Sequence, residues 1–366
     1  MNAAFWQGKR VFVTGHTGFK GSWLCLLLTE LGAQVRGFAL PPPSEPSLFR
    51  LAALETLVDS LEGDVREPTS LAAALIDFQP DVVFHLAAQA LVRASYRDPI
   101  ATYATNVLGT VHLLDAVRRA EGVQAVVNVT SDKCYRNVSA SRAFDEQQPL
   151  GGHDPYSNSK ACAELVSEAF RASYFSAPDA RVALATARAG NVIGGGDWAE
   201  DRLIPDIVRC CLAGRSVEIR NPAAIRPWQH VLEPLSAYLL LAERLCDSNQ
   251  AFAEAWNFGP RVEDARPVAE VVELVVQLWG EPAAWHCNSA SQPHEAATLR
   301  LDCTKAQTRL GWRPQLSLGT ALRWTIDWYQ RQAAGDDARE LTLGQIRAFR
   351  HLDDDSATEH DRRAAA

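Results

Sequence analysis

The chain has 366 residues, of which 47% are hydrophobic and 22% are charged, and its formal net charge is −8. This length allows one large α/β unit or two modest domains, and the negative charge without any basic tract argues against nucleic acid as a partner. No apolar run approaches the roughly 20 residues that cross a bilayer, and residues 1–10 lack a signal peptide, so we expect a cytoplasmic protein with no membrane partner.

The first predicted strand, at residues 10–14, leads through a glycine-spaced turn into a helix. RVFVT is apolar and β-branched, GHTGFKG follows it, and SWLCLLLTELG has a helical pattern that ends at Gly32. Gly15, Gly18 and Gly21 therefore stand between a strand and a helix. Residues without side chains allow a tight turn there and a close approach of the backbone to a pyrophosphate, which predicts a dinucleotide site.

Strands and helices continue to alternate through the first half of the chain. Further strands are predicted at residues 33–40, 57–65, 81–88, 123–132 and 181–188, and further helices at 68–78, 99–122 and 157–173. Such alternation with short loops predicts an α/β fold with a Rossmann-type, doubly wound parallel sheet. Its ligand is expected beyond the carboxyl ends of the strands.

The regular alternation is lost after residue 188. The loops at 190–202 and 219–231 are rich in Gly, Pro, Trp and Arg, which favours a smaller, mixed α/β domain that binds the substrate. Residues 351–366 are charged and lack apolar periodicity, which predicts a disordered tail. The expected division is a cofactor-binding domain at 1–188 with a return segment at about 228–260, and a substrate-binding domain at 189–350.

The eight cysteines show no Cys-x-x-Cys pair of the kind found in zinc or redox sites. We therefore expect reduced thiols and no metal site.

A phenol and an ammonium stand four residues apart in the sequence Tyr156-Ser157-Asn158-Ser159-Lys160. Residues with this spacing share one face of a helix. A nearby cation favours the tyrosinate form and lowers the pKa of a phenol from about 10, so that Tyr156 can take a proton from an alcohol as a hydride leaves. The alternative is a surface pair without a catalytic role.

Together, the Gly-x-x-Gly-x-x-Gly and Tyr-x-x-x-Lys motifs resemble the extended short-chain dehydrogenase/reductase family, over the chain to roughly residue 330. The resemblance implies NAD as the cofactor. The acidic residue that usually binds the ribose is absent, because Phe38, Ala39 and Leu40 occupy its place. No obvious phosphate-binding arginine is present beyond Arg36, which favours NAD over NADP. The positions implied at the cofactor are Gly15, Thr17, Gly18, Phe19, Gly21, Asp64, Val65, Leu86, Ala87, Ala88, Asn106, Tyr156 and Lys160.

The strand at 123–132 ends in the sequence Ser131-Asp132-Lys133. In the family, a Ser or Thr at this place hydrogen-bonds the reacting sugar hydroxyl, and the nucleotide-sugar 4,6-dehydratases add an acid/base pair directly after it. The resemblance thus implies five catalytic residues: Ser131, Asp132, Lys133, Tyr156 and Lys160. Lys133 and the segments 190–206 and 226–234 resemble the branch that acts on CDP-glucose.

The implied reaction oxidises C4 of the sugar, eliminates water across C5 and C6, and returns the hydride to C6. Asp132 suits the acid if burial keeps it protonated. Lys133 is either a neutral base for the C5 proton or a cation that stabilises the enolate, and the sequence leaves this open. An exposed Asp132–Lys133 ion pair is the alternative to both roles.

A nucleoside diphosphate calls for cationic partners in the C-terminal loops. The residues implied at the substrate are Asn191, Arg202, Arg226 and His230, and either arginine is alternatively a salt-bridged loop residue. Trp198 and Trp228 either stack on a base or pack the loops. Relatives pair through two helices per subunit, which implies a homodimer or a dimer of dimers.

Two other functions remain open from the sequence. A nucleotide-sugar 4-epimerase or reductase shares the fold, NAD, Tyr156 and Lys160, but it has no need of Asp132 and Lys133. A non-catalytic NAD-sensing protein has no need of the Tyr–Lys pair.

Overall fold

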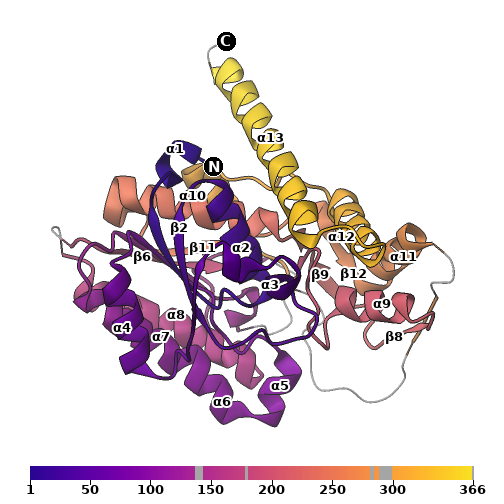
Figure 1. Cartoon of the computed structure of the whole chain (residues 1–366), viewed down its shortest axis with the longest axis horizontal. Helices are drawn as coiled ribbons and strands as arrows, with labels where there is room; N and C mark the ends of the chain where they lie inside the picture. The colour runs from indigo at the N-terminus through magenta and orange to yellow at the C-terminus, as the bar shows by residue number, and fades with distance from the viewer. Residues whose placement is uncertain (137–142, 178–179, 281–283, 288–298, 365–366) are drawn as a thin grey trace.

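The computed structural model describes residues 1–136, 143–177, 180–280, 284–287 and 299–364. Seven strands form one parallel sheet in the order β11-β6-β5-β4-β1-β2-β3 (Figure 1). They are β1 (Arg10–Thr14), β2 (Gln34–Ala39), β3 (Asp59–Glu62), β4 (Val82–His85), β5 (Ala125–Val129), β6 (Ala183–Arg188) and β11 (Ala255–Asn257). Because the order reverses between β1 and β4, the predicted Rossmann-type sheet is confirmed, and the carboxyl ends of these strands mark the expected ligand crevice.

Successive residues of each central strand face opposite sides of the sheet. Val11 and Val13 belong to one core cluster, whereas Phe12 belongs to another. Such alternation follows from the two-residue period of a strand, and here both faces are apolar because helices cover both. The Phe12 face is covered by α4 (Pro68–Phe78), α7 (Gly109–Arg119) and α8 (Pro155–Tyr174); the other face is covered by α2 (Phe19–Glu30) and α10 (Leu232–Ser248) (Figure 1).

The predicted helix at 99–122 is present with a change of hydrogen-bonding pattern in its middle. The α-helical turn of α6 (Pro99–Tyr103) continues into the π-helical stretch η2 (Ala104–Leu108) and then into α7 without a break. Asp98 caps the start, since its side chain accepts a hydrogen bond from the backbone of Ala101. The short helix α5 (Val92–Arg97) precedes α6.

The second half of the chain adds three two-stranded sheets beside the main one. β10 (Gln229–His230) pairs with β7 (Val192–Ile193), β12 (Ala265–Pro267) with β9 (Ile225–Pro227), and β13 (Trp285–Cys287) with β8 (Val217–Ile219). The other helices are α1 (Ala3–Trp6), α3 (Leu48–Leu51), α9 (Leu203–Leu212), α11 (Val268–Trp279), α12 (Leu318–Ala333) and α13 (Ala338–Ala364). In the parts of the chain described, every helix is too short or too polar to span a bilayer.

The return segment expected at about 228–260 contains α10 and β11, which join the main sheet. β11 pairs with β6 in parallel, and α10 contributes fully buried leucines to the core on the α2 side. These contacts agree with the expected return, whereas the division of the chain into two domains stays a prediction.

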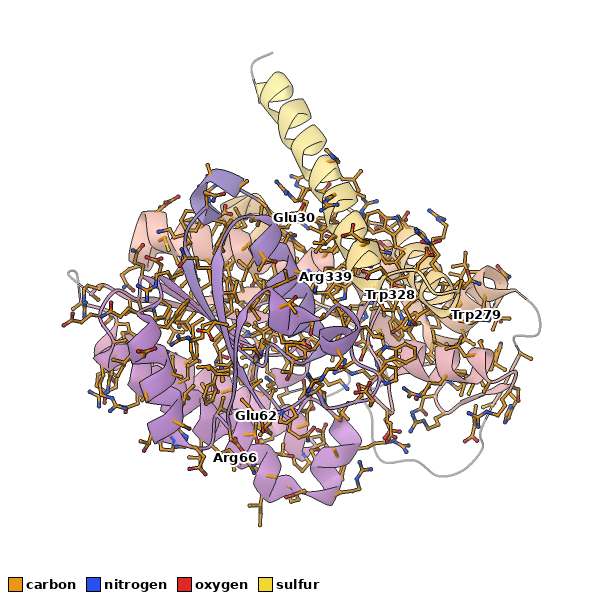
Figure 2. The ribbon with its side chains drawn as sticks, viewed as in Figure 1. Glu30, Glu62, Arg66, Trp279, Trp328 and Arg339 are labelled. Carbon is orange, nitrogen blue, oxygen red and sulfur yellow. The ribbon has the colours of Figure 1, made fainter. Side chains whose placement is uncertain are left out.

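Helix α13 begins on the body of the protein and then projects away from it (Figure 1). Arg339 donates to the backbone oxygens of Ala52 and Ala53, and Arg347 pairs with Glu30 at 2.7 Å; Figure 2 labels Arg339 and Glu30. The helix continues to Ala364, and the sequence contains neither Gly nor Pro after Gly344 to interrupt it. The expected disorder of residues 351–366 stays a prediction.

Candidate active site

One cavity of about 790 Å³ lies beyond the carboxyl ends of β1, β4, β5 and β6. This is the place where ligands bind in open parallel sheets. The predicted residues that line it are Gly15, Thr17, Gly18, Phe19, Gly21, Asp64, Val65, Leu86, Ala87, Ala88, Ser131, Asp132, Lys133, Tyr156, Lys160, Asn191, Arg202 and Arg226. The fold therefore gathers 18 of the 20 predicted site residues around one space, and the two that it places elsewhere are Asn106 and His230.

The glycine turn can pack closely against the neighbouring backbone only because its residues lack side chains. Gly15 has φ +76°, and a Cβ on it would lie 2.7 Å from the backbone nitrogen of Ala87. A Cβ on Gly21 would lie 2.1 Å from the carbonyl oxygen of Gly15. Gly18 precedes the first residue of α2, whose free N–H groups point at the turn. This cradle fits a dinucleotide pyrophosphate, which the N-terminus of a helix attracts.

The adenosine end of the cradle has charged groups that are already paired. Arg36 donates to Asp59 and to Asp77, both at 2.6 Å, so it is not free for a ribose phosphate. Asp64 pairs with Arg66 in its own loop, and the hydrogen bonds of Arg66 hold the pKa of that carboxyl below its usual range. The pairing of Arg36 favours NAD over NADP.

Asn106 lies behind the cavity wall rather than on its surface. Its side-chain oxygen accepts from the backbone of Gln89 at 2.8 Å, and its amide nitrogen donates to the Gln89 carbonyl and to Ser159. It thus fixes the segment after β4 against α8, and this placement corrects the predicted direct contact with the cofactor.

The turn at the floor of the cavity follows β5 and contains Ser131, Asp132 and Lys133. Ser131 caps the short helix η3 (Asp132–Cys134): its hydroxyl accepts from the backbone of Lys133 at 3.2 Å and donates to Asp132 Oδ1 at 3.1 Å. Asp132 is buried, and its Oδ2 has no hydrogen-bond partner among the described residues. Burial raises the pKa of Asp132, although the nearby charge of Lys133 acts to lower it. The alternative of a solvent-exposed Asp132–Lys133 ion pair is therefore excluded, because the Asp132 carboxyl is buried.

Tyr156 and Lys160 lie on the first turns of α8, which Asp154 caps by accepting from the backbone of Ser157 at 2.9 Å. Burial raises the pKa of Tyr156 to about 12, although its hydrogen bond with Ser131 acts in the opposite direction. Lys160 donates to the carbonyl oxygen of Val129 at 3.2 Å, and burial lowers its pKa to about 8. In the protein alone, the pKa of Tyr156 is thus raised and not lowered as predicted, because burial of the phenol is the largest effect on it.

The predicted substrate contacts differ in their surroundings. Arg202 forms an ion pair with Asp197 at 2.9 Å, and Asn191 adopts a left-handed conformation with φ +42°. Arg226 is buried and close enough to Asp132 to oppose the rise in its pKa. All three line the cavity, so each is placed to meet a bound anion.

His230 is fully buried away from the cavity, between Trp23 and Trp324. Its ring meets both indoles edge-on, at centroid distances of 5.7 and 5.6 Å, and burial lowers its pKa to about 3. The predicted substrate contact of His230 is therefore corrected to a packing role. The two tryptophans named in the loops, Trp198 and Trp228, are buried and also line the cavity.

Sequence reasoning missed Lys20, which lines the cavity from the first turn of α2. Burial lowers its pKa to about 8, helped by the charges of Arg202 and Lys160 and opposed by Asp132. Its position inside the glycine motif was the available signal, since a cationic side chain beside a predicted pyrophosphate site is a candidate partner for that anion.

Gly190 was missed as well, although it fixes the position of Asp132. A Cβ on Gly190 would lie 1.8 Å from Asp132 Oδ2 and 2.1 Å from Cγ. Nothing in the local sequence reveals this contact, because β6 and β5 bring the two residues together only in the folded sheet.

We expect Gly190→Ala to lower kcat by ~10²-fold, because the methyl group forces Asp132 from its place and a displacement of about 1 Å has an effect of that size. Steady-state kinetics on the purified variant check this. The matched control is Gly344→Ala, since a Cβ there meets nothing within 4 Å. Unchanged kcat in the Gly190 variant would show that the position of Asp132 is not critical.

Known proteins resemble this chain along most of its length. The family described as GDP-mannose 4,6 dehydratase matches residues 12–325. A CDP-glucose 4,6-dehydratase of Salmonella typhimurium is 54% identical over 336 residues, which cover 91% of this chain and 94% of that protein. A dTDP-glucose 4,6-dehydratase of Xanthomonas campestris is 27% identical and covers 87% of this chain and 92% of its own. The structure of DesIV, a dTDP-glucose 4,6-dehydratase from Streptomyces venezuelae with NAD and TYD bound, has a TM-score of 0.75 at 25% identity and covers 89% of this chain and 98% of its own.

Proposed function

Because the chain belongs to the GDP-mannose 4,6 dehydratase family, we propose that it converts CDP-glucose into CDP-4-keto-6-deoxyglucose by removal of water, with NAD as its cofactor. The cytidine carrier is supported by the Salmonella relative at 54% identity. The observation that carries the reaction type is that Asp132 and Lys133 line the same cavity as Ser131, Tyr156 and Lys160. A 4-epimerase or reductase has no departing hydroxyl for such a pair to assist.

The residues at the β1 turn suit the proposed cofactor. NAD, when bound, supplies an acceptor for the C4 hydride and the donor that returns it to C6, and its nicotinamide ring brings a positive charge. Gly15, Gly18 and the N-terminus of α2 would hold its pyrophosphate, and Tyr156 and Lys160 would lie at its reactive end.

Tyr156 would take the proton of the C4 hydroxyl. In the protein alone its phenol is protonated at neutral pH, because burial raises its pKa to about 12. The Ser131 hydroxyl, Lys160 and the positive charge of the bound cofactor are the groups that would stabilise the phenolate. Ser131 would also orient the sugar hydroxyl, since it lies between Tyr156 and Asp132. Proton removal therefore depends on the assembled complex.

Asp132 and Lys133 would perform the elimination. The C4 ketone makes the C5 proton acidic; when that proton leaves, the C5 electron pair forms the C5–C6 double bond and the C6 hydroxyl departs as water. Burial of Asp132 favours its protonated form, so Asp132 would donate the proton to the departing hydroxyl. Lys133 would act at C5, either as the base or as the cation beside the enolate.

Arginines that line the cavity would hold the diphosphate. Arg226 is buried beside Asp132, and Arg202 is oriented by Asp197. Arg93 and Arg220 also line the cavity and both reach Asp201, at 3.7 and 2.9 Å. Guanidinium groups suit this task because they bind phosphate with two parallel hydrogen bonds.

The proposed function is tested by incubation of the protein with NAD and, separately, with CDP-, dTDP-, UDP- and GDP-linked hexoses. We expect loss of water by mass and the alkali-induced near-UV absorbance of a 4-keto-6-deoxy sugar, with CDP-glucose alone. A C4 epimer without loss of water would instead identify an epimerase. Turnover of another nucleotide sugar in preference would overturn the cytidine assignment.

We further propose a homodimer or a dimer of dimers. Large apolar side chains are exposed on neighbouring helices that run along one side of the protein: Ile100 of α6 is 82% exposed, Leu108 of η2 is 52% and Leu165 of α8 is 53%. An apolar face of this kind favours association, because water contact with it is unfavourable.

We expect the double substitution Leu108→Glu, Leu165→Glu to convert the dimer into a monomer, because charges in the apolar face oppose its burial. Light scattering after size exclusion measures the mass. Val262→Glu is the matched control, since Val262 is 79% exposed on a different element, η5 (Val262–Asp264). A double variant that stays dimeric would place the interface elsewhere.

We place the reaction in the cytoplasm. Seven of the eight cysteines are free thiols: Cys25, Cys134, Cys162, Cys210, Cys211, Cys246 and Cys303. Reduced cysteines are typical of the cytosol.

A further inference from the structure

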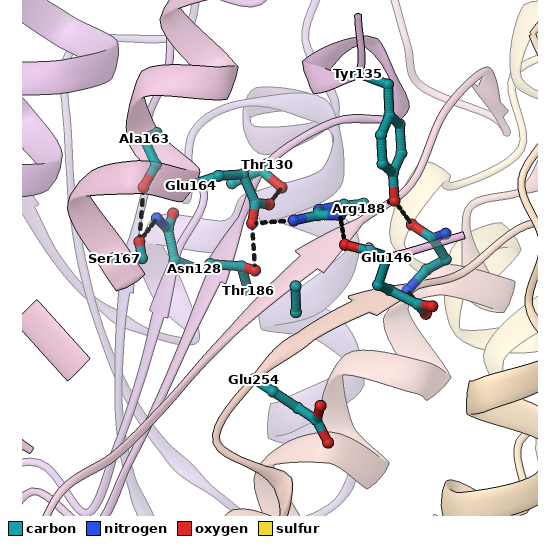
Figure 3. A network of polar contacts seen from close by, with 12 residues as sticks. Asn128, Thr130, Tyr135, Glu146, Ala163, Glu164, Ser167, Thr186, Arg188 and Glu254 are labelled. Atoms are coloured by element: carbon teal, nitrogen blue, oxygen red, sulfur yellow. Dashed lines mark hydrogen bonds and ion pairs between the residues drawn. The ribbon is translucent and has the colours of Figure 1, made fainter. Parts of the chain in front are cut away.

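A buried ion pair lies behind the candidate catalytic residues, between Glu164 of α8 and Arg188 at the end of β6 (Figure 3). Arg188 Nη2 donates to Glu164 Oε2 at 2.8 Å, and both side chains are almost fully buried, with 4% and 3% exposed. The same carboxylate accepts from the Thr186 hydroxyl at 2.7 Å and from the Thr130 hydroxyl. Glu164 therefore receives three donors and connects α8 to the ends of β5 and β6.

The arginine extends this network to the other side of the catalytic turn. Arg188 Nη1 donates to the Tyr135 hydroxyl at 2.8 Å, and the guanidinium lies over the Tyr135 ring at 4.9 Å. Tyr135 in turn donates to Asn257 of β11 at 2.7 Å (Figure 3). The turn from Ser131 to Cys134 is thus held from both sides, by Thr130 before it and Tyr135 after it.

Glu164 also lies one helical turn after Lys160, on the same face of α8. The titratable groups that face Lys160 are Tyr156 and Glu164 on its own helix, Cys134 from η3, His85 from β4 and Lys20 from α2. The Tyr156 phenol is neutral at pH 7 because burial raises its pKa to about 12. Burial keeps Cys134 and His85 neutral, since it raises the pKa of the thiol and lowers that of the imidazole to about 3. Lys20 repels a second cation. Among these groups, Glu164 is therefore the anion. Its negative charge favours the charged form of Lys160, which burial disfavours.

A buried ion pair contributes little to stability compared with apolar side chains of the same volume, because desolvation of both charges offsets their attraction. The presence of this pair thus calls for another explanation. Its contacts supply one: it joins the strand end that carries Ser131 to the helix that carries Tyr156 and Lys160.

We propose that Glu164 and Arg188 are positioning residues for the reaction, which hold the Ser131–Cys134 turn against α8 and keep the Lys160 ammonium charged beside Tyr156. This inference rests on the proposed function. It assigns two roles to one carboxylate: hydrogen bonds fix the geometry, and the negative charge supports a cation that the buried site otherwise disfavours.

The test is the pH dependence of C4 oxidation, followed in a single turnover by rapid quench, since this step does not need Asp132. Lys160 must be protonated to stabilise the phenolate, so the rate falls as pH rises through the Lys160 pKa of about 8. Glu164→Gln removes the charge but keeps the shape, which lowers that pKa further. We expect the alkaline limb to move to lower pH by about one unit or more.

The double variant Glu164→Gln, Arg188→Met separates charge from folding. Glu164→Gln alone leaves a buried cation unpaired and lowers the Tm, whereas the double variant has no unpaired charge and recovers it. If the negative charge of Glu164 raises the pKa of Lys160, the oxidation rate of the double variant still falls at the lower pH expected for Glu164→Gln, although the Tm of the double variant is restored. A stable double variant with a wild-type pH profile would overturn the inference. Absence of dehydration by the wild type, measured in parallel, would instead overturn the proposed function.

Discussion

Tyr156→Phe is expected to lower kcat by ~10³-fold, since removal of a positioned proton acceptor has effects of 10²- to 10⁴-fold. Loss of the hydroxyl removes the group that takes the C4 proton and the hydrogen bond to Ser131, while the ring still fills the same buried space. The KM for the nucleotide sugar is expected to change much less. Steady-state rates with CDP-glucose, together with the formation of 4-ketone in a single turnover, provide the measurement.

Tyr103→Phe is the matched control for this variant. The Tyr103 hydroxyl donates to Asn158 at 2.9 Å, outside the cavity wall. Equal activity of both variants would show that the phenol of Tyr156 takes no part in proton transfer. Suppose that only Tyr156→Phe loses activity, and that it forms neither the 4-ketone nor the dehydrated product. Tyr156 would then be assigned to the first step, the oxidation at C4.

Asp132→Asn is expected to block the elimination while the oxidation continues. Asparagine has nearly the same shape but cannot donate an acidic proton, so water loss should slow by ~10²- to 10⁴-fold. Quenched reactions should then contain a product lighter than the substrate by two hydrogen atoms rather than by one water, as mass spectrometry can distinguish. The Tm should not fall, because Asp132 Oδ2 has no partner to lose among the described residues.

The pH profile of the elimination gives a second reading of Asp132. Burial raises its pKa, so the protonated form that donates persists to higher pH than for an exposed carboxyl, and water loss should decline as pH rises through that raised value. Asp81→Asn serves as the control, since Asp81 accepts from the backbone of Arg10 at the opposite end of the sheet. An Asp132→Asn variant that still releases water at the wild-type rate would assign the acid to another group.

The sequence predicted the features that depend on local spacing. Gly15, Gly18 and Gly21 stand in one turn, and Tyr156 and Lys160 share one face of α8, so their proximity follows from short stretches of chain. The parallel sheet was predicted for a similar reason, because apolar strands separated by helices allow few other arrangements.

The features that sequence reasoning missed depend on contacts between distant elements. Gly190 meets Asp132 across two paired strands, and His230 lies between Trp23 and Trp324, which come from α2 and α12. The pKa of Tyr156 was predicted in the wrong direction because the motif reveals the nearby cation but not the extent of burial. Residue spacing cannot supply the depth at which a group lies.

The edge strand β11 has a consequence for how the protein is made. β11 (Ala255–Asn257) completes the sheet beside β6. A nascent chain that has left the ribosome only as far as residue 254 therefore exposes β6 as an edge strand, with one row of its backbone hydrogen-bonding groups unsatisfied. Such an apolar edge can pair with other chains. Asn257 is also the partner of Tyr135, so the catalytic turn acquires its last support from the same late segment. Synthesis of more than two thirds of the polypeptide must therefore precede the closing of both the sheet and the active site.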